Sequence, residues 1–173
     1  MSPNHQNALP DILRAEKTGW EELESLVGAL TPQQAEIPGY APGWSVKDLL
    51  AHVAGWLSEA GRALQLITLG TYVEKDVDVD ARNGIFVEAN RHQPLSVVLF
   101  EAKAARRRLL HHLHGVAEIP PAAAAPLHKA GPEHYNEHLP RLREWVTQLA
   151  APRQSSEQPS SPGRAADDGN TAQ

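Results

Sequence analysis

Two histidines, His134 and His138, stand four residues apart in the segment GPEHYNEHLPRLREW. Side chains at positions i and i+4 of a helix lie one above the other on the same face, so these two imidazoles can chelate one metal ion. A third histidine, His52, lies far upstream in GWSVKDLLAHVAGW. If the two segments form helices that pack face to face, the three rings converge. That arrangement predicts a metal site with open coordination positions, as metal catalysis requires.

The same histidines also have a simpler interpretation. The chain contains nine histidines, so one pair with this spacing can arise by chance, as two half-exposed residues on an amphipathic helix. Two features favour the metal site: His134 and His138 share a helical face with Leu142, and His52 shares a stripe with Trp56. A buried neutral histidine needs hydrogen-bond partners or a metal. One shared site therefore explains three core-facing histidines more simply than three separate environments do.

The composition narrows the available chemistry. The chain has no cysteine, which excludes disulfides, thiolate nucleophiles and cysteine-ligated zinc. The net charge of −5 argues against a nucleic-acid partner, and the short run 106–108 of arginines is expected to be a solvated helix face. No stretch approaches the roughly 20 apolar residues of a membrane span, and the N-terminal segment lacks the apolar run of a secretory signal. We therefore expect a cytoplasmic protein with no membrane partner.

Apolar residues recur three and four positions apart, which predicts helices and almost no sheet. The predicted helices cover residues 10–30, 45–69, 78–91, 94–114 and 132–149. Ser45 is a suitable N-cap, and Asp48 is placed to complete a capping box. The prolines and glycines of 32–43 predict a long connection with at most one turn of helix, and the prolines of 116–130 predict an extended connection.

The chain of 173 residues is long enough for one hydrophobic core, and we place a single domain at 9–150. Residues 151–173 contain no large apolar side chain. Because such a segment cannot offset its ordering entropy by burial, it is predicted to be a disordered tail. Pro140 lies inside the last predicted helix and should kink it beside the histidine pair, unless that helix begins later.

Together, the histidine segments resemble signatures of the DinB superfamily of four-helix-bundle metal proteins. GWSVKDLLAHVAGW is similar to the second-helix signature, particularly in the ClbS/DfsB branch and in the maleylpyruvate isomerase N-terminal-like proteins. HYNEHLPRLREW is similar to the final-helix signature, and DVDARNGIFVEANRHQPLSVVLFEA to the third-helix region of ClbS-like members. The resemblance covers about residues 9–149. It implies an all-α four-helix bundle of the DinB/YfiT-like type with up-down-down-up topology.

Carried over by motif position, the resemblance implies that His52, His134 and His138 are metal ligands. The metal it implies is zinc or nickel, and three neutral imidazoles suit either ion. It also implies a metal-dependent hydrolase or thiol-dependent transferase acting on a reactive small molecule, since a bound divalent ion activates water or a thiol. No general acid or base accompanies the triad in the sequence, so catalytic residues stay unassigned.

Four further residues are candidates for supporting the ligands or lining a pocket. Asp48, one turn before His52, is expected to accept the ring N–H of that histidine unless helix capping competes for it. Asn83 either lines the pocket or lies on the surface. Trp56 is expected either as a pocket wall or as an ordinary core residue, and Tyr135 is expected as a pocket wall.

Two other functions stay open at this point. The first is a non-catalytic small-molecule binding or self-resistance protein, in which the metal is structural or absent. The second is a stress protein that acts through protein interaction as a homodimer. The complete histidine triad favours an enzyme over both.

Overall fold

Helices account for all the regular structure in residues 8–151, the part of the chain that the computed structural model describes. In chain order they are α1 (Ala8–Gly28), α2 (Pro32–Ala35), α3 (Val46–Thr68), α4 (Val79–Asn90), α5 (Leu95–His114), the 3-10 turn η1 (Pro121–Ala123), α6 (Ala124–His128) and α7 (Pro132–Ala150). This part of the chain contains no strand, and one isolated bridge joins Ala41 to Trp44. The all-α prediction is therefore confirmed. Apart from its first residue, the predicted tail 151–173 lies outside the described residues, and the domain boundary at 150 stays a prediction.

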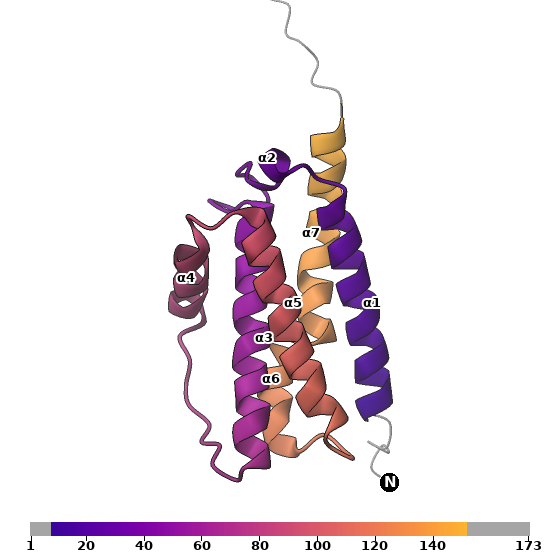
Figure 1. Cartoon of the computed structure of the whole chain (residues 1–173), viewed down its shortest axis with the longest axis vertical. Coiled ribbons are helices and arrows are strands. Elements are labelled where there is room, and N and C mark those ends of the chain that lie inside the picture. The colour runs from indigo at the N-terminus through magenta and orange to yellow at the C-terminus, as the bar shows by residue number, and fades with distance from the viewer. Residues whose placement is uncertain (1–7, 152–173) are drawn as a thin grey trace, which may run out of the picture.

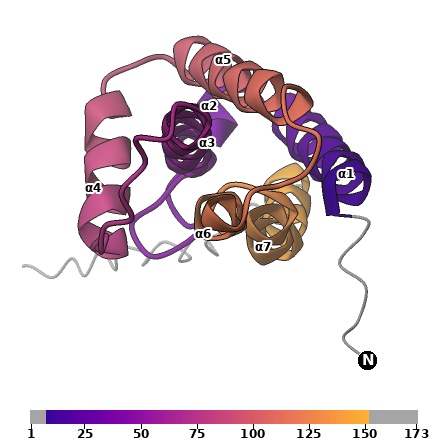
Figure 2. The same cartoon turned by 90° about the horizontal axis from the view of Figure 1, so that it is seen from below.

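Four long helices form the bundle (Figure 1). α1 and α7 run in one direction and α3 and α5 run in the other, which is the up-down-down-up order that the resemblance implied. α3 packs along α5, and α1 packs along α7. Viewed from below, α4 lies outside the bundle beside α3 (Figure 2). None of the described helices is long and apolar enough to cross a membrane.

α3 has a well-defined start and carries many of the buried residues. The Ser45 hydroxyl accepts a hydrogen bond from the Asp48 backbone N–H at 3.2 Å, and the Asp48 carboxylate accepts one from the Ser45 backbone N–H at 2.8 Å. This predicted capping box satisfies backbone donors that a helix leaves free at its N-terminus. Because the cap determines where α3 begins, it also determines which face of the helix carries His52.

The core contains one buried ion pair that joins three helices. Glu16 of α1 is 1% exposed and accepts two hydrogen bonds from the Arg106 guanidinium of α5, at 2.7 and 2.8 Å. The Tyr135 hydroxyl of α7 donates a third at 3.3 Å. The expectation of a solvated face was therefore wrong for Arg106, whose partner comes from a distant segment, whereas Arg107 and Arg108 are exposed.

Two sequence-based boundaries need correction, and a third is as predicted. The first helix ends at Gly28, before the predicted 30. The predicted extended connection 116–130 contains η1 and α6, because prolines are tolerated in the first turn of a helix, where backbone N–H groups have no intrahelical partner. α7 begins at Pro132 and continues through Pro140, so the alternative of a later start is excluded.

Candidate metal centre

Three histidine side chains from two helices meet at one point of the bundle. His52 comes from α3, and His134 and His138 come from successive turns of α7. The Nε2 atom of His52 lies 2.7 Å from that of His134 and 3.1 Å from that of His138, and the latter two lie 3.1 Å apart. Within residues 8–151 these are the one group of three or more potential ligand side chains close enough to hold an ion. The structure thus brings the predicted trio together.

Hydrogen bonds alone cannot satisfy this triangle of nitrogens. In a neutral imidazole, Nε2 carries either a hydrogen or a lone pair. However the hydrogens are assigned, at least one of the three contacts joins two hydrogens or two lone pairs, which repel each other. Zinc–nitrogen bonds of about 2.0–2.1 Å place neighbouring ligand nitrogens about 2.9–3.4 Å apart, and two of the three separations fall in that range. The three residues therefore fit a divalent metal ion.

Burial disfavours the protonated form of all three rings. His52 and His134 are each 5% exposed. Burial lowers the pKa of His52 to about 4, and repulsion from a protonated His138 acts in the same direction. The side chain of Asn83 opposes this shift, although Nδ1 of His52 has no hydrogen-bond partner in the described residues. Burial and the neighbouring His52 lower the pKa of His134 to about 2. Burial also lowers the pKa of His138, against an opposing contribution from Glu137. Neutral rings have the free lone pair that a metal needs.

Two aromatic residues of the connection between α2 and α3 contact members of the triad. The Trp44 ring centroid lies 5.1 Å from that of His52. The Tyr40 hydroxyl lies 3.0 Å from Nδ1 of His138 and 3.3 Å from the backbone carbonyl oxygen of the same residue. Sequence reasoning missed Tyr40, because it lies in a proline- and glycine-rich connection without a periodic pattern. The only local signal was an aromatic residue a few positions before the His52 motif.

The residues predicted to support the ligands make different contacts in the structure. Asp48 accepts hydrogen bonds from the backbone N–H and hydroxyl of Ser45, at 2.8 and 2.7 Å, while Nδ1 of His52 has no hydrogen-bond partner in the described residues. Helix capping thus engages the carboxylate that was expected to hold the His52 ring. Asn83 accepts a hydrogen bond from the Trp56 indole N–H at 2.9 Å and is half-buried. These two residues join α4 to α3 one turn beyond His52.

Tyr135 lies in the core and not at the metal centre. It is 1% exposed, and its hydroxyl bonds to Glu16. Burial raises its pKa well above the usual value, with a further contribution from the neighbouring Glu16 carboxylate. The structure therefore places Tyr135 in the packed core instead of at the expected pocket wall.

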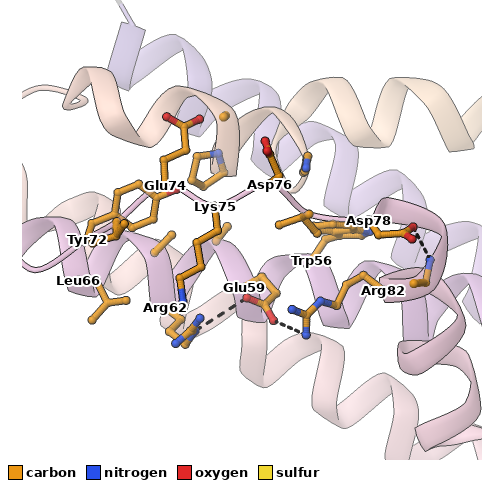
Figure 3. Close-up of a pocket in the computed structure, with 18 of the residues that line it drawn as sticks. Trp56, Glu59, Arg62, Leu66, Tyr72, Glu74, Lys75, Asp76, Asp78 and Arg82 are labelled. Carbon is orange, nitrogen blue, oxygen red and sulfur yellow. Dashed lines mark hydrogen bonds and ion pairs between the residues drawn. The ribbon is translucent and has the colours of Figure 1, made fainter.

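A cavity of about 580 Å³ lies along α3, under the connection 71–78 and beside α4 and α6 (Figure 3). Trp56 forms part of its wall, with the Lys129 ammonium 5.1 Å from the ring centroid. Glu59 lies within 3.5 Å of the Arg82 guanidinium (Figure 3). The three histidines of the triad do not line this cavity, whereas Trp56, one turn along α3 from His52, does. Its volume falls within the roughly 300–1,000 Å³ typical of small-molecule sites.

Comparisons with known proteins agree with this geometry. The family model described as mycothiol maleylpyruvate isomerase N-terminal domain matches residues 17–143, which include all three histidines. The fold is similar to that of an uncharacterised protein from Escherichia coli UTI89, whose crystal structure superposes with a TM-score of 0.69. The match covers 80% of this chain and 92% of that chain. Because the sequence identity is 15%, the similarity supports the fold alone. No curated protein matches the chain. Membership of the ClbS/DfsB branch stays a prediction. Sequence match, bundle topology and histidine triad agree, and the chain belongs to the metal-associated, DinB-like family of mycothiol maleylpyruvate isomerase N-terminal domains.

Proposed function

We propose that the protein is a divalent-metal-dependent enzyme, either a hydrolase or a thiol-dependent transferase, that acts on a reactive small molecule. The observation that carries the proposal is the convergence of three Nε2 atoms, from two buried histidines and one half-buried histidine, within 3.1 Å of one another. Zinc or nickel suits these ligands. When bound, the ion supplies Lewis-acid chemistry and keeps positions for water, a thiol or the substrate.

The chain itself contributes ligand binding and a place for the organic part of the substrate. The ion would be held by the neutral imidazole rings of His52, His134 and His138. The cavity beside α3 has walls of mixed character, in which apolar side chains alternate with four acidic and four basic residues, and Lys129 is one of the basic ones. Because Lys129 forms no ion pair within residues 8–151, its charge is available to orient an anionic group of a ligand.

One observation favours the non-catalytic alternative of a small-molecule binding or self-resistance protein. In the described residues no carboxylate hydrogen-bonds to the triad, since Asp48 bonds to Ser45. Proton transfer in an enzyme of this kind is then left to the substrate or to a thiol cosubstrate. A protein that only sequesters its ligand needs no such group.

Elemental analysis of the untagged protein, purified without added metal, tests the proposal. We expect about one zinc or nickel ion per chain. His52→Ala and His138→Ala should abolish metal retention without unfolding the bundle, whereas His111→Ala, which changes an exposed histidine of α5, should keep the metal. Stoichiometric metal in both triad variants would exclude the assignment.

Activity assays then separate the two functions. The metal-loaded protein is incubated with a panel of small electrophiles, with and without an added low-molecular-weight thiol. Turnover that requires the thiol identifies a transferase, and turnover without it identifies a hydrolase. Stoichiometric binding of an electrophile without turnover supports the sequestering protein.

A further inference from the structure

The three histidines differ in what their second ring nitrogen contacts. Nδ1 of His138 lies 3.0 Å from the Tyr40 hydroxyl oxygen. Nδ1 of His52 and Nδ1 of His134 are buried and have no hydrogen-bond partner in the described residues. Tyr40 is itself 3% exposed, so water does not compete freely for its hydroxyl. His138 is thus the one triad member with a protein partner for Nδ1.

The position of the Tyr40 hydroxyl selects one tautomer of His138. The Tyr40 hydroxyl oxygen lies 3.3 Å from the backbone carbonyl oxygen of His138, in addition to its contact with Nδ1. A carbonyl oxygen only accepts, so both contacts can be hydrogen bonds only if the hydroxyl donates its hydrogen there and presents a lone pair to Nδ1. Nδ1 then carries the ring hydrogen and donates it to Tyr40. In a neutral ring this leaves the free lone pair on Nε2, which faces the other two histidines.

The connection that carries Tyr40 is fastened to the same helix as His138. The Arg141 guanidinium of α7 donates hydrogen bonds to the carbonyl oxygens of Tyr40 and Gly39, both at 2.9 Å. Gly39 has a φ of +126°, and a Cβ there would lie 2.6 Å from the Trp145 ring of α7. These contacts hold the phenol at a fixed place on α7, over the turn that carries His138.

We propose that Tyr40 is a positioning residue of the metal centre: it holds His138 with the hydrogen on Nδ1 and the ring aimed so that Nε2 binds the ion. This inference rests on the proposed metal-binding role of the triad. Hydrogen-bond partners of metal-binding histidines typically change metal affinity by about 10–100-fold. We expect an effect of that size from the loss of the Tyr40 hydroxyl.

The test compares two tyrosine variants of the full-length protein. Tyr40→Phe removes the hydroxyl that faces His138, and Tyr135→Phe removes a buried hydroxyl that bonds to Glu16, away from the triad. Zinc affinity is measured by competition with a chelator, and the visible spectrum of the cobalt-substituted protein reports the ligand geometry. Tyr40→Phe should bind zinc about 10–100-fold more weakly and alter the cobalt spectrum. Tyr135→Phe should change neither. Equal zinc affinity in wild type and Tyr40→Phe, or equal weakening in both variants, would overturn the proposal.

A second readout does not depend on metal binding. Nitrogen-15 NMR of the imidazoles in the metal-free protein distinguishes the two neutral tautomers. We expect His138 to carry its hydrogen on Nδ1 in the wild type and to populate both tautomers in Tyr40→Phe. A wild type that binds no metal yet shows this tautomer would refute the proposed function while leaving in place the control of the His138 tautomer by Tyr40. An unchanged His138 tautomer in Tyr40→Phe would contradict the inference itself.

If Tyr40→Phe fails to fold, Arg141→Gln replaces it. This variant releases the connection from α7 without touching a triad residue. We expect weaker zinc binding in the same direction, and unchanged zinc affinity would count against the proposal.

Discussion

Individual buried side chains carry both the chemistry and part of the stability of this bundle. His52 and His134 are almost fully buried yet polar, and so are Glu16 and Lys47. Lys47 donates hydrogen bonds to Glu36 and to two backbone carbonyl oxygens of the segment between α4 and α5. In contrast, the three Nε2 atoms of the triad face one another, and their contacts cannot all be hydrogen bonds. That difference separates a structural polar residue from a candidate ligand.

The Glu16–Arg106 pair provides a prediction at this scale. Arg106→Met removes both hydrogen bonds to Glu16 and leaves a buried carboxylate with only the Tyr135 hydroxyl. Breaking a buried ion pair from one side typically costs about 3–5 kcal/mol of the free energy of unfolding. Chemical denaturation should show a loss of this size. Arg107→Met, which changes the exposed neighbour in the same helix, should change the free energy of unfolding by less than about 0.5 kcal/mol.

A double variant separates the pair from simple loss of packing. Replacing both partners with apolar residues, as Glu16→Leu with Arg106→Met, should be less destabilising than Arg106→Met alone, because no buried charge is left unpaired. If the double variant is the less stable one, the network contributes more than charge compensation.

Among the elements, α4 depends on one close contact with α3. It buries none of its residues fully and lies outside the bundle, beside the cavity. Phe86 of α4 packs directly on Gly55 of α3, and the Trp56–Asn83 hydrogen bond lies next to it. Phe86 therefore reaches the bundle through a gap that only a glycine leaves.

Gly55→Ala tests this attachment. An added Cβ would lie 2.3 Å from the Phe86 ring, so the ring and α4 must move. We expect a loss of about 1–3 kcal/mol in the free energy of unfolding, as for other overpacked sites, with faster proteolysis within 71–91. Limited proteolysis and denaturation measure the two effects.

Gly84→Ala is the matched control, since Gly84 lies in α4 and a Cβ there meets no atom within 4 Å. It should stabilise the protein by up to about 1 kcal/mol, the helix preference of alanine over glycine. A Gly55→Ala variant that is as stable as wild type would show that α4 is not held by this contact.

Considered as a whole, the molecule consists of two closely packed helix pairs, α3 with α5 and α1 with α7. The triad takes one ligand from the first pair and two from the second. A bound ion would therefore link the two pairs, and it would bind the folded chain far better than the unfolded one.

Zinc should accordingly stabilise the whole protein. At a free zinc concentration 100 times the dissociation constant, linkage predicts a gain of about 2.7 kcal/mol in the free energy of unfolding. Thermal unfolding of the metal-free protein, with and without zinc, measures this gain. His52→Ala should show none of it, and an equal gain in that variant would place the ion elsewhere.

Local sequence patterns by themselves determined the all-α class, the approximate helix positions and the cap of α3. They also placed His134 and His138 on one face of a helix. Helical periodicity and capping act over a few residues, so they can be read without knowing the fold. Bringing His52 to that pair required the family resemblance in addition, because the spacing of residues in two helices does not say how the helices pack.

Tertiary structure alone decided the contacts between distant segments. Tyr40 is 98 residues from His138, and Glu16 is 90 from Arg106, so no local pattern links either pair. The assignment of Asp48 to the cap, in place of the His52 ring, was likewise decided by which hydrogen bond the folded chain satisfies. Side-chain partners depend on which groups burial leaves without water, and burial is a property of the packed molecule.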